Sequence, residues 1–184
     1  MGRFLPDRLC PSPRILFVGI NPSPRSAALK HHYAGRGNPF WKLMHASGLI
    51  PEPLTFEQDA QVVRHGLALT NLVDRPTRAA DELTREEQLA GRARLERLIR
   101  RLEPETVALV GASIYRLLFG SQATPGCGLK PQTFAGARVF VLPNPSGRNA
   151  AYPGFAHKLL YFQQLARLHP SKAALRVTGA ARRA

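Results

Sequence analysis

The 184-residue chain carries 26 Lys and Arg against 12 Asp and Glu, which gives a formal net charge of +14. This length suits one compact domain and excludes two ordinary ones, and the 44% of hydrophobic residues excludes wholesale disorder. The excess of positive charge indicates a polyanionic partner, most simply nucleic acid.

Cys10 and Cys127 are the two cysteines of the sequence, and no CxxC pair is present. One chain can therefore build neither a disulfide framework nor a four-thiolate iron–sulfur or zinc site. Residues 1–13 lack the apolar core of a signal peptide, and eighteen consecutive apolar residues occur nowhere. We expect an intracellular, cytoplasmic and nucleoid-associated protein that does not bind membranes.

Apolar runs and helical periodicity predict alternating strands and helices. Runs rich in branched residues without alternation are typical of strands buried on both faces. A capping-box pattern at Thr84–Glu87, followed by apolar residues at helical spacing up to Glu103-Pro104, predicts a further helix. In chain order we expect a strand at 15–18, helices at 39–47 and 56–65, a strand at 67–73, the helix from 84 to 102, a strand at 107–111, a helix at 112–119, a strand at 139–142 and a helix at 153–168 with Phe155, Leu159, Phe162 and Ala166 on one face.

This order predicts a three-layer α/β/α fold with a central, mostly parallel sheet of four or five strands. We assign residues 1–13 to an N-terminal extension and 14–168 to the folded domain. Residues 169–184 carry four basic side chains and no acidic ones, which predicts a loose cationic tail.

Polar clusters follow three of the predicted strands, where the site of an open parallel sheet lies. GINPSP begins at residue 19, TNLVDRPT at 70 and NPSGRN at 144. Taken singly, each has a plain alternative: Asn-Pro is a common turn, and NPSG can be a tight Pro-Gly turn. No Walker lysine and no GxGxxG pattern follows the first strand, which disfavours a nucleotide-binding enzyme.

The segment KHHYAGRGNPFWK at 30–42 combines basic and aromatic residues around two glycines. A basic loop with an aromatic residue suits stacking on an exposed base. The alternative is a solvated loop whose aromatic residues enter the core, which we expect for Phe40 and Trp41, leaving Tyr33 as the stacking candidate. Adjacent histidines point apart and have no third ligand at suitable spacing, so we predict no metal site and no cofactor.

Together, GINP at 19–22, HHYAGRGNPFWK at 31–42, TNLVDRPT at 70–77 and LPNPSGRN at 142–149 resemble the mismatch-specific uracil and thymine DNA glycosylases of the uracil-DNA glycosylase superfamily. The resemblance runs from about residue 14 to residue 168. Other branches of the superfamily carry an acidic residue in the first motif or four iron–sulfur cysteines, and neither feature is present here.

The resemblance implies a role for each motif. In relatives the Asn of GINP, here Asn21, holds the water that attacks the sugar C1′ after the nucleotide has been flipped out of the helix. Tyr33 would stack on the flipped base, Asn71 would read its edge, and the backbone near Gly19 and Ile20 would line the pocket.

The NPSG segment resembles the insertion loop of the family, which fills the vacated base stack. Arg148 occupies the wedge position next to Gly147, Ser146 would bond a phosphate, and Asn144 would stabilise the leaving base. Lys30 and Arg36 are candidate DNA contacts.

At two positions the resemblance does not assign a role directly. Relatives usually read GINPG, and Ser23 stands in the place of that glycine, so a turn with positive φ would be altered. Asp74 is a second candidate for activating water, although a salt bridge with Arg75 or Arg78 is the alternative role.

The sequence therefore predicts a monomeric, monofunctional DNA glycosylase that removes uracil from double-stranded DNA. G·U mismatches are the preferred substrate, with thymine and other deaminated or modified bases as further candidates, and the product would enter base-excision repair. The alternative is a non-catalytic basic DNA-binding module, for which charge and stacking residues suffice.

Overall fold

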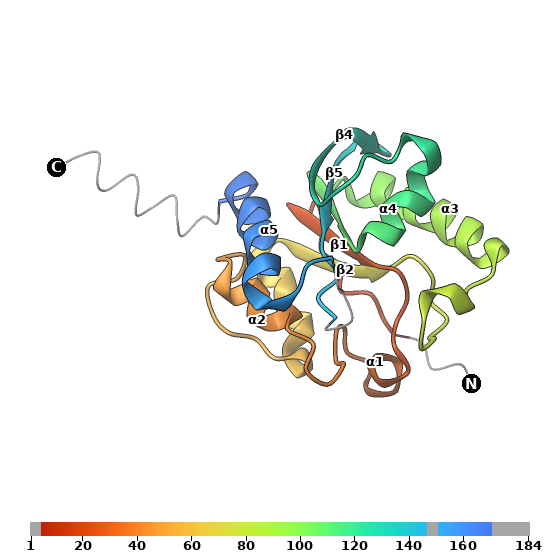
Figure 1. Ribbon diagram of the computed structural model, residues 1–184. Helices are drawn as coiled ribbons and strands as arrows, with labels where there is room; N and C mark the ends of the chain where they lie inside the picture. The colour runs from red at the N-terminus through yellow and green to blue at the C-terminus, as the bar shows by residue number, and fades with distance from the viewer. Residues whose placement is uncertain (1–4, 147–150, 171–184) are drawn as a thin grey trace.

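The computed structural model describes residues 5–146 and 151–170, and within them five strands form one sheet in the order β2-β1-β3-β5-β4 (Figure 1). The strands are β1 (Ile15–Gly19), β2 (Leu67–Asn71), β3 (Thr106–Val110), β4 (Gly128–Phe134) and β5 (Ala137–Leu142). Neighbouring strands are parallel except β4, which pairs antiparallel with β5 at the sheet edge. The predicted mostly parallel sheet is confirmed.

Helices cover both faces of the sheet (Figure 1). One face packs against α2 (Phe40–Ala46), the 3-10 helix η1 (Phe56–His65) and α5 (Gly154–Leu168), and the other against α3 (Arg85–Leu102) and α4 (Ala112–Phe119). Alternate residues of each strand point to opposite faces of the sheet and pack into two separate cores. In β1, Ile15 and Phe17 pack into the core beneath α2, η1 and α5, and Leu16 and Val18 pack into the core beneath α3 and α4. Continuous apolar runs in the sequence reflect this burial on both faces.

Three short helices and one strand were not anticipated from the sequence. Helix α1 (Pro24–Leu29) is capped by Ser23, and η2 (Ala80–Glu82) and η3 (Gly120–Gln122) are single turns. Strand β4 alternates between buried and exposed side chains and contains Lys and Gln, so it lacks the apolar run that marks the central strands. On the predicted apolar face of α5, Phe155 at the start of the helix is 40% exposed.

Residues 5–13, which we assigned to an extension, run along the outer edge of β2. Arg8 and Leu69 exchange backbone hydrogen bonds of 2.9 and 2.8 Å as an antiparallel bridge. Asp7 accepts a 2.7 Å hydrogen bond from Thr70 Oγ1. At the other end, His169 is buried and contacts Thr106, and residues 171–184 lie outside the described residues.

In the described parts of the chain, no helix combines the length and the apolar character needed to cross a bilayer.

Gly91 allows α3 to approach the sheet closely. A Cβ atom at this position would lie 2.3 Å from the backbone oxygen of Leu72, directly after β2. Since that oxygen belongs to the backbone, neither partner can move without displacing the helix or the strand.

We therefore expect Gly91→Ala to destabilise the protein, although Gly to Ala inside a helix normally stabilises it by about 1 kcal/mol. Overpacking of this kind costs roughly 1–3 kcal/mol, and urea unfolding followed by circular dichroism measures it. An unchanged or raised free energy of unfolding would show that α3 does not depend on this contact.

Candidate active site at the carboxyl edge of the sheet

A cleft of about 660 Å³ lies beyond the carboxyl ends of the parallel strands. The loops after β1, β2 and β5 and the segment between α1 and α2 all contribute to it. No carboxylate belongs to its described lining, which consists of Leu5, Gly19, Ile20, Asn21, Pro22, Ser23, Ser26, His32, Tyr33, Gly35, Arg36, Gly37, Asn38, Asn71, Thr77, Arg78, Ala79, Ala80, Val110, Asn144, Pro145 and Ser146.

The loops after β1 and β2 run side by side and are hydrogen-bonded to each other. Leu72 N donates to Gly19 O at 2.8 Å, and Val73 N donates to Ile20 O at 2.9 Å. Further along, Thr77 N donates to Pro22 O at 3.2 Å. The register that pairs Gly19 with Asn71 in the sheet therefore continues into the wall of the cleft.

The carboxamide of Asn21 has a fixed orientation. Its Nδ2 donates to the backbone oxygen of Arg75 at 2.9 Å and to Thr77 Oγ1 at 2.6 Å. Thr77 Oγ1 gives its own proton to Ala79 O at 2.6 Å, so it can only accept from Asn21. Both amide hydrogens are thus used on acceptors, and Oδ1 remains as an oriented acceptor for a ligand in the cleft.

Gly19 makes room for the Asn71 side chain at the floor of the cleft. A Cβ atom there would lie 2.5 Å from Asn71 Oδ1 and 3.6 Å from the Tyr33 hydroxyl. The absence of a side chain at Gly19 therefore leaves space for the Asn71 carboxamide at the end of β1, whereas the Tyr33 hydroxyl would lie at ordinary van der Waals distance.

Tyr33 presents an aromatic ring in an uncommon backbone conformation. Its φ is 55°, a left-handed value that costs a non-glycine residue about 1–2 kcal/mol. The ring stacks on Phe40 with centroids 3.6 Å apart and planes inclined by 14°. Burial raises the pKa of the phenol, so the hydroxyl stays protonated, and it is buried without a hydrogen-bond partner among the described residues.

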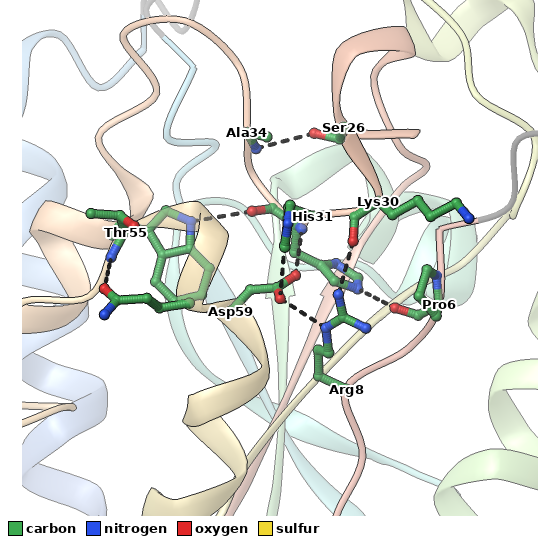
Figure 2. Close-up of polar contacts among 11 residues, drawn as sticks. Pro6, Arg8, Ser26, Lys30, His31, Ala34, Thr55 and Asp59 are labelled. Atoms are coloured by element: carbon green, nitrogen blue, oxygen red, sulfur yellow. Dashed lines mark hydrogen bonds and ion pairs between the residues drawn. The ribbon is translucent and has the colours of Figure 1, made fainter. Parts of the chain in front are cut away.

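Helix α1 holds the segment that follows Tyr33. Ala34 N donates to Ser26 Oγ at 3.1 Å (Figure 2), and Arg25 Nε donates to Ala34 O at 2.7 Å. Ser23 begins this helix with φ −68°, and its hydroxyl accepts from Ser26 N. Position 23 thus has no positive φ, which agrees with the expectation that serine in place of the usual glycine alters this turn. Serine serves here as an ordinary helix N-cap.

His32 is a neutral part of the cleft lining. Burial lowers its pKa to about 4, and its side chain contacts Pro6 O through Nε2 at 3.1 Å. A carbonyl oxygen only accepts, so Nε2 carries the proton. The imidazole therefore contributes no positive charge to the cleft at neutral pH.

The loop after β5 is supported by a lysine of α5. Lys158 is 3% exposed, and its Nζ donates to Pro145 O at 3.1 Å and to Ser146 O at 3.0 Å. Asn144 Oδ1 accepts from Ser146 N at 2.9 Å, which closes a side-chain turn. Gly147 and Arg148 lie outside the described residues.

The structure thus brings most of the predicted site residues to one cleft, and two of them do not belong to its lining. Gly19, Ile20, Asn21, Tyr33, Arg36, Asn71, Asn144 and Ser146 line it. Lys30 is exposed outside the lining and ends α1.

Asp74 is the second predicted residue outside the lining. Its carboxylate pairs with Arg94 Nη2 at 3.1 Å, and burial raises its pKa. The expected partners were wrong, because Arg75 pairs instead with Glu87 across the turn that precedes α3, and the backbone of Arg78 is bound by Glu82.

Sequence reasoning missed Thr77, His32 and Lys158 as parts of the site. Thr77 belongs to the TNLVDRPT motif, but its hydrogen bond to Asn21 joins residues 56 positions apart in the sequence. The sequence around His32 does not indicate that its side chain is buried, and Lys158 resembles the many surface lysines and arginines of a basic protein. Only the folded chain shows that these groups are buried.

Two comparisons with known proteins bear on this cleft. The family model of the uracil DNA glycosylase superfamily matches residues 6–166. The chain belongs to the uracil DNA glycosylase superfamily.

A solution NMR structure from Methanosarcina acetivorans, determined under the provisional designation of uracil DNA glycosylase, is similar with a TM-score of 0.61 at 21% identity. The alignment covers 89% of the present chain and 97% of the archaeal one. At 21% identity this similarity supports the fold alone. The two proteins share that fold over 97% of the chain from Methanosarcina acetivorans.

Burial of neutral His32 makes the stability of this glycosylase superfamily member pH-dependent. Because its pKa falls from 6.5 in the unfolded chain to about 4 in the fold, protons bind first to the unfolded state as the pH drops. Between pH 7 and pH 4 this group should remove about 3 kcal/mol from the free energy of unfolding.

Denaturant unfolding at several pH values measures this loss. His32→Gln keeps a donor for Pro6 and should flatten the pH dependence over this interval, whereas His45→Gln, at an exposed site in α2, serves as the matched control. Equal slopes for wild type and His32→Gln would contradict the assignment.

Proposed function

We propose that the protein is a monofunctional DNA glycosylase that hydrolyses the N-glycosidic bond of uracil in double-stranded DNA, preferably in G·U mismatches, and so initiates base-excision repair. Membership of the uracil DNA glycosylase superfamily supports the reaction class. The observation that carries the proposal is the Asn21 carboxamide, fixed by Arg75 O and Thr77 Oγ1 beside Tyr33 and Asn71 in one cleft.

In this reaction the oriented Oδ1 of Asn21 accepts a hydrogen bond from the attacking water. The bond between C1′ and the base breaks, the water oxygen joins C1′, and the water proton leaves to solvent or to the departing base. An amide is too weak a base to remove that proton early. The reaction therefore proceeds through an oxocarbenium-like state, in which donors and nearby phosphates stabilise the separated charges.

The floor of the cleft suits a flipped, neutral base. Tyr33 offers the ring face opposite Phe40 for stacking, and the Asn71 carboxamide supplies both a donor and an acceptor for the base edge. Unpairing a mismatch costs less than unpairing a normal pair, which supports the preference for G·U. An aromatic face stacks on any base, so thymine and other deaminated or modified bases are candidate substrates as well.

The rim of the cleft suits the DNA backbone. Arg36 and Arg78 are exposed members of the lining, and the whole chain carries a net charge of +14. Phosphate contacts of this kind give affinity with little sequence preference. Arg148, which we propose as the wedge that fills the vacated stack, lies outside the described residues.

A non-catalytic DNA-binding module of the same fold is the alternative function, because its positive charge and stacking residues would suffice for binding. Turnover separates the two functions. Incubation with a G·U duplex followed by alkali should cut the strand at the uracil, and a panel with A·U, G·T, G·hypoxanthine and single-stranded uracil defines the range.

Asn21→Ala should lower the single-turnover rate of uracil release by at least about 100-fold, the range typical of losing one oriented hydrogen-bonding group at the reacting atoms. Binding to the same duplex, measured by fluorescence anisotropy, should change little, because the phosphate contacts remain.

Asp74→Asn is the companion variant for this test. Because Asp74 does not line the cleft, its loss should leave base release within a few-fold of wild type. If Asn21→Ala leaves the rate of uracil release unchanged and Asp74→Asn lowers it strongly, then the Asp74 carboxylate, and not the Asn21 amide, activates the water.

Thr77→Val should slow base release about tenfold, because the Asn21 amide loses one of the two acceptors that set its orientation, a change worth about 1.4 kcal/mol. Thr77→Ser keeps the hydroxyl and should restore most of the rate. If valine and serine behave alike in single-turnover assays, the hydroxyl does not orient Asn21.

A further inference from the structure

Asp59, on η1, is a buried carboxylate for which the proposed reaction has no direct use. Its side chain is 0% exposed, and it does not belong to the lining of the cleft. Burying a carboxylate is costly unless charged or hydrogen-bonding partners compensate it. The identity of its partners therefore indicates what the group does.

Both oxygens of Asp59 bind donors from elsewhere in the chain (Figure 2). Oδ1 accepts from Arg8 Nε at 2.9 Å and contacts His31 Nδ1 at 3.2 Å. Oδ2 accepts from the backbone N of His32 at 2.8 Å. Arg8 also donates through Nη2 to Lys30 O at 2.8 Å, so the carboxylate joins the N-terminal segment to the end of α1 and the start of the Tyr33 loop.

The same network fixes the peptide groups directly before Tyr33. The backbone N of His32 donates to Asp59, and the backbone O of His32 accepts from Trp41 Nε1 at 3.1 Å. Tyr33 follows with its φ of 55°. A residue in this unfavourable conformation persists only where its surroundings hold it, and these two hydrogen bonds hold the chain on the N-terminal side.

We infer that Asp59 is a positioning residue, which keeps the Tyr33 ring stacked on Phe40 with its other face available to a flipped base. The inference rests on the proposed function, because it assigns Tyr33 the stacking role. Asp59 touches neither the base nor the sugar in this arrangement, and it acts on the reaction only through the loop that carries Tyr33.

Asp59→Asn tests the inference with little change of shape. The amide nitrogen would face a donor, Arg8 or His31 on one side or the His32 N on the other, so at least one hydrogen bond is lost. The single-turnover rate of uracil release from a G·U duplex should fall about tenfold, while the dissociation constant for DNA changes by less than about twofold.

A double-mutant cycle with Tyr33→Ala separates positioning from general damage. If Asp59 acts through Tyr33, then adding Asp59→Asn to Tyr33→Ala should change the rate by less than about twofold. Glu57→Gln is the matched control, since it removes an exposed carboxylate from the same short helix and should leave the rate unchanged. A full tenfold loss in the Tyr33→Ala background would overturn the inference.

Amide hydrogen exchange gives a readout that does not need activity. The peptide covering residues 31–36 should exchange faster in Asp59→Asn than in wild type or Glu57→Gln, while peptides from β1 and β3 stay protected. If Asp59→Asn does not fold, Arg8→Lys replaces it, with a rate loss of about threefold that again disappears with Tyr33→Ala.

The outcomes distinguish the two proposals. A wild-type protein that releases no base from any duplex refutes the proposed function, and the exchange experiment still decides whether Asp59 orders the loop. Normal base release with unchanged exchange in Asp59→Asn refutes the positioning role alone.

Discussion

The parallel pairing of β1 with β2 is the constraint on which the cleft depends. It sets Gly19 opposite Asn71, and the hydrogen bonds beyond the strand ends keep the two following loops in the same register. A slip of one residue would turn every side chain to the other face of the sheet. Asn21 would then lose the acceptors on the β2 loop that orient its amide.

The cleft is neutral at its floor and cationic at its rim. Its ionisable members deep in the fold, His32 and Tyr33, are held in their neutral forms by burial, and its described lining contains no carboxylate. Arg36 and Arg78 are exposed at its edge. Such a distribution suits the proposed function, in which an uncharged base enters the floor and phosphates lie near the arginines, and no carboxylate of the described lining would repel DNA.

Buried charged groups outside the cleft hold its loops in place. Asp59 ties down the segment before Tyr33, and Lys158 holds the backbone of the loop after β5. Lys158 binds two backbone oxygens, and Asp59 binds the backbone N of His32 together with the side chains of Arg8 and His31. Such partners are the usual condition for burying an ionisable side chain. The strands therefore form the rigid part of the fold, and the buried charged side chains of Asp59 and Lys158 hold the irregular loops in place beside them.

The sequence by itself determined the layered fold, the central strands and the presence of three polar loops after strands, because burial on both faces leaves continuous apolar runs and the carboxyl ends of parallel strands share one edge. It did not reveal β4, whose exposed face breaks the apolar run. Only the tertiary structure decided which way the Asn21 amide points, and that Asp59, His32 and Lys158 are buried. Those properties arise from contacts between residues far apart in the chain, such as Asn21 with Thr77, and local sequence patterns do not encode such contacts.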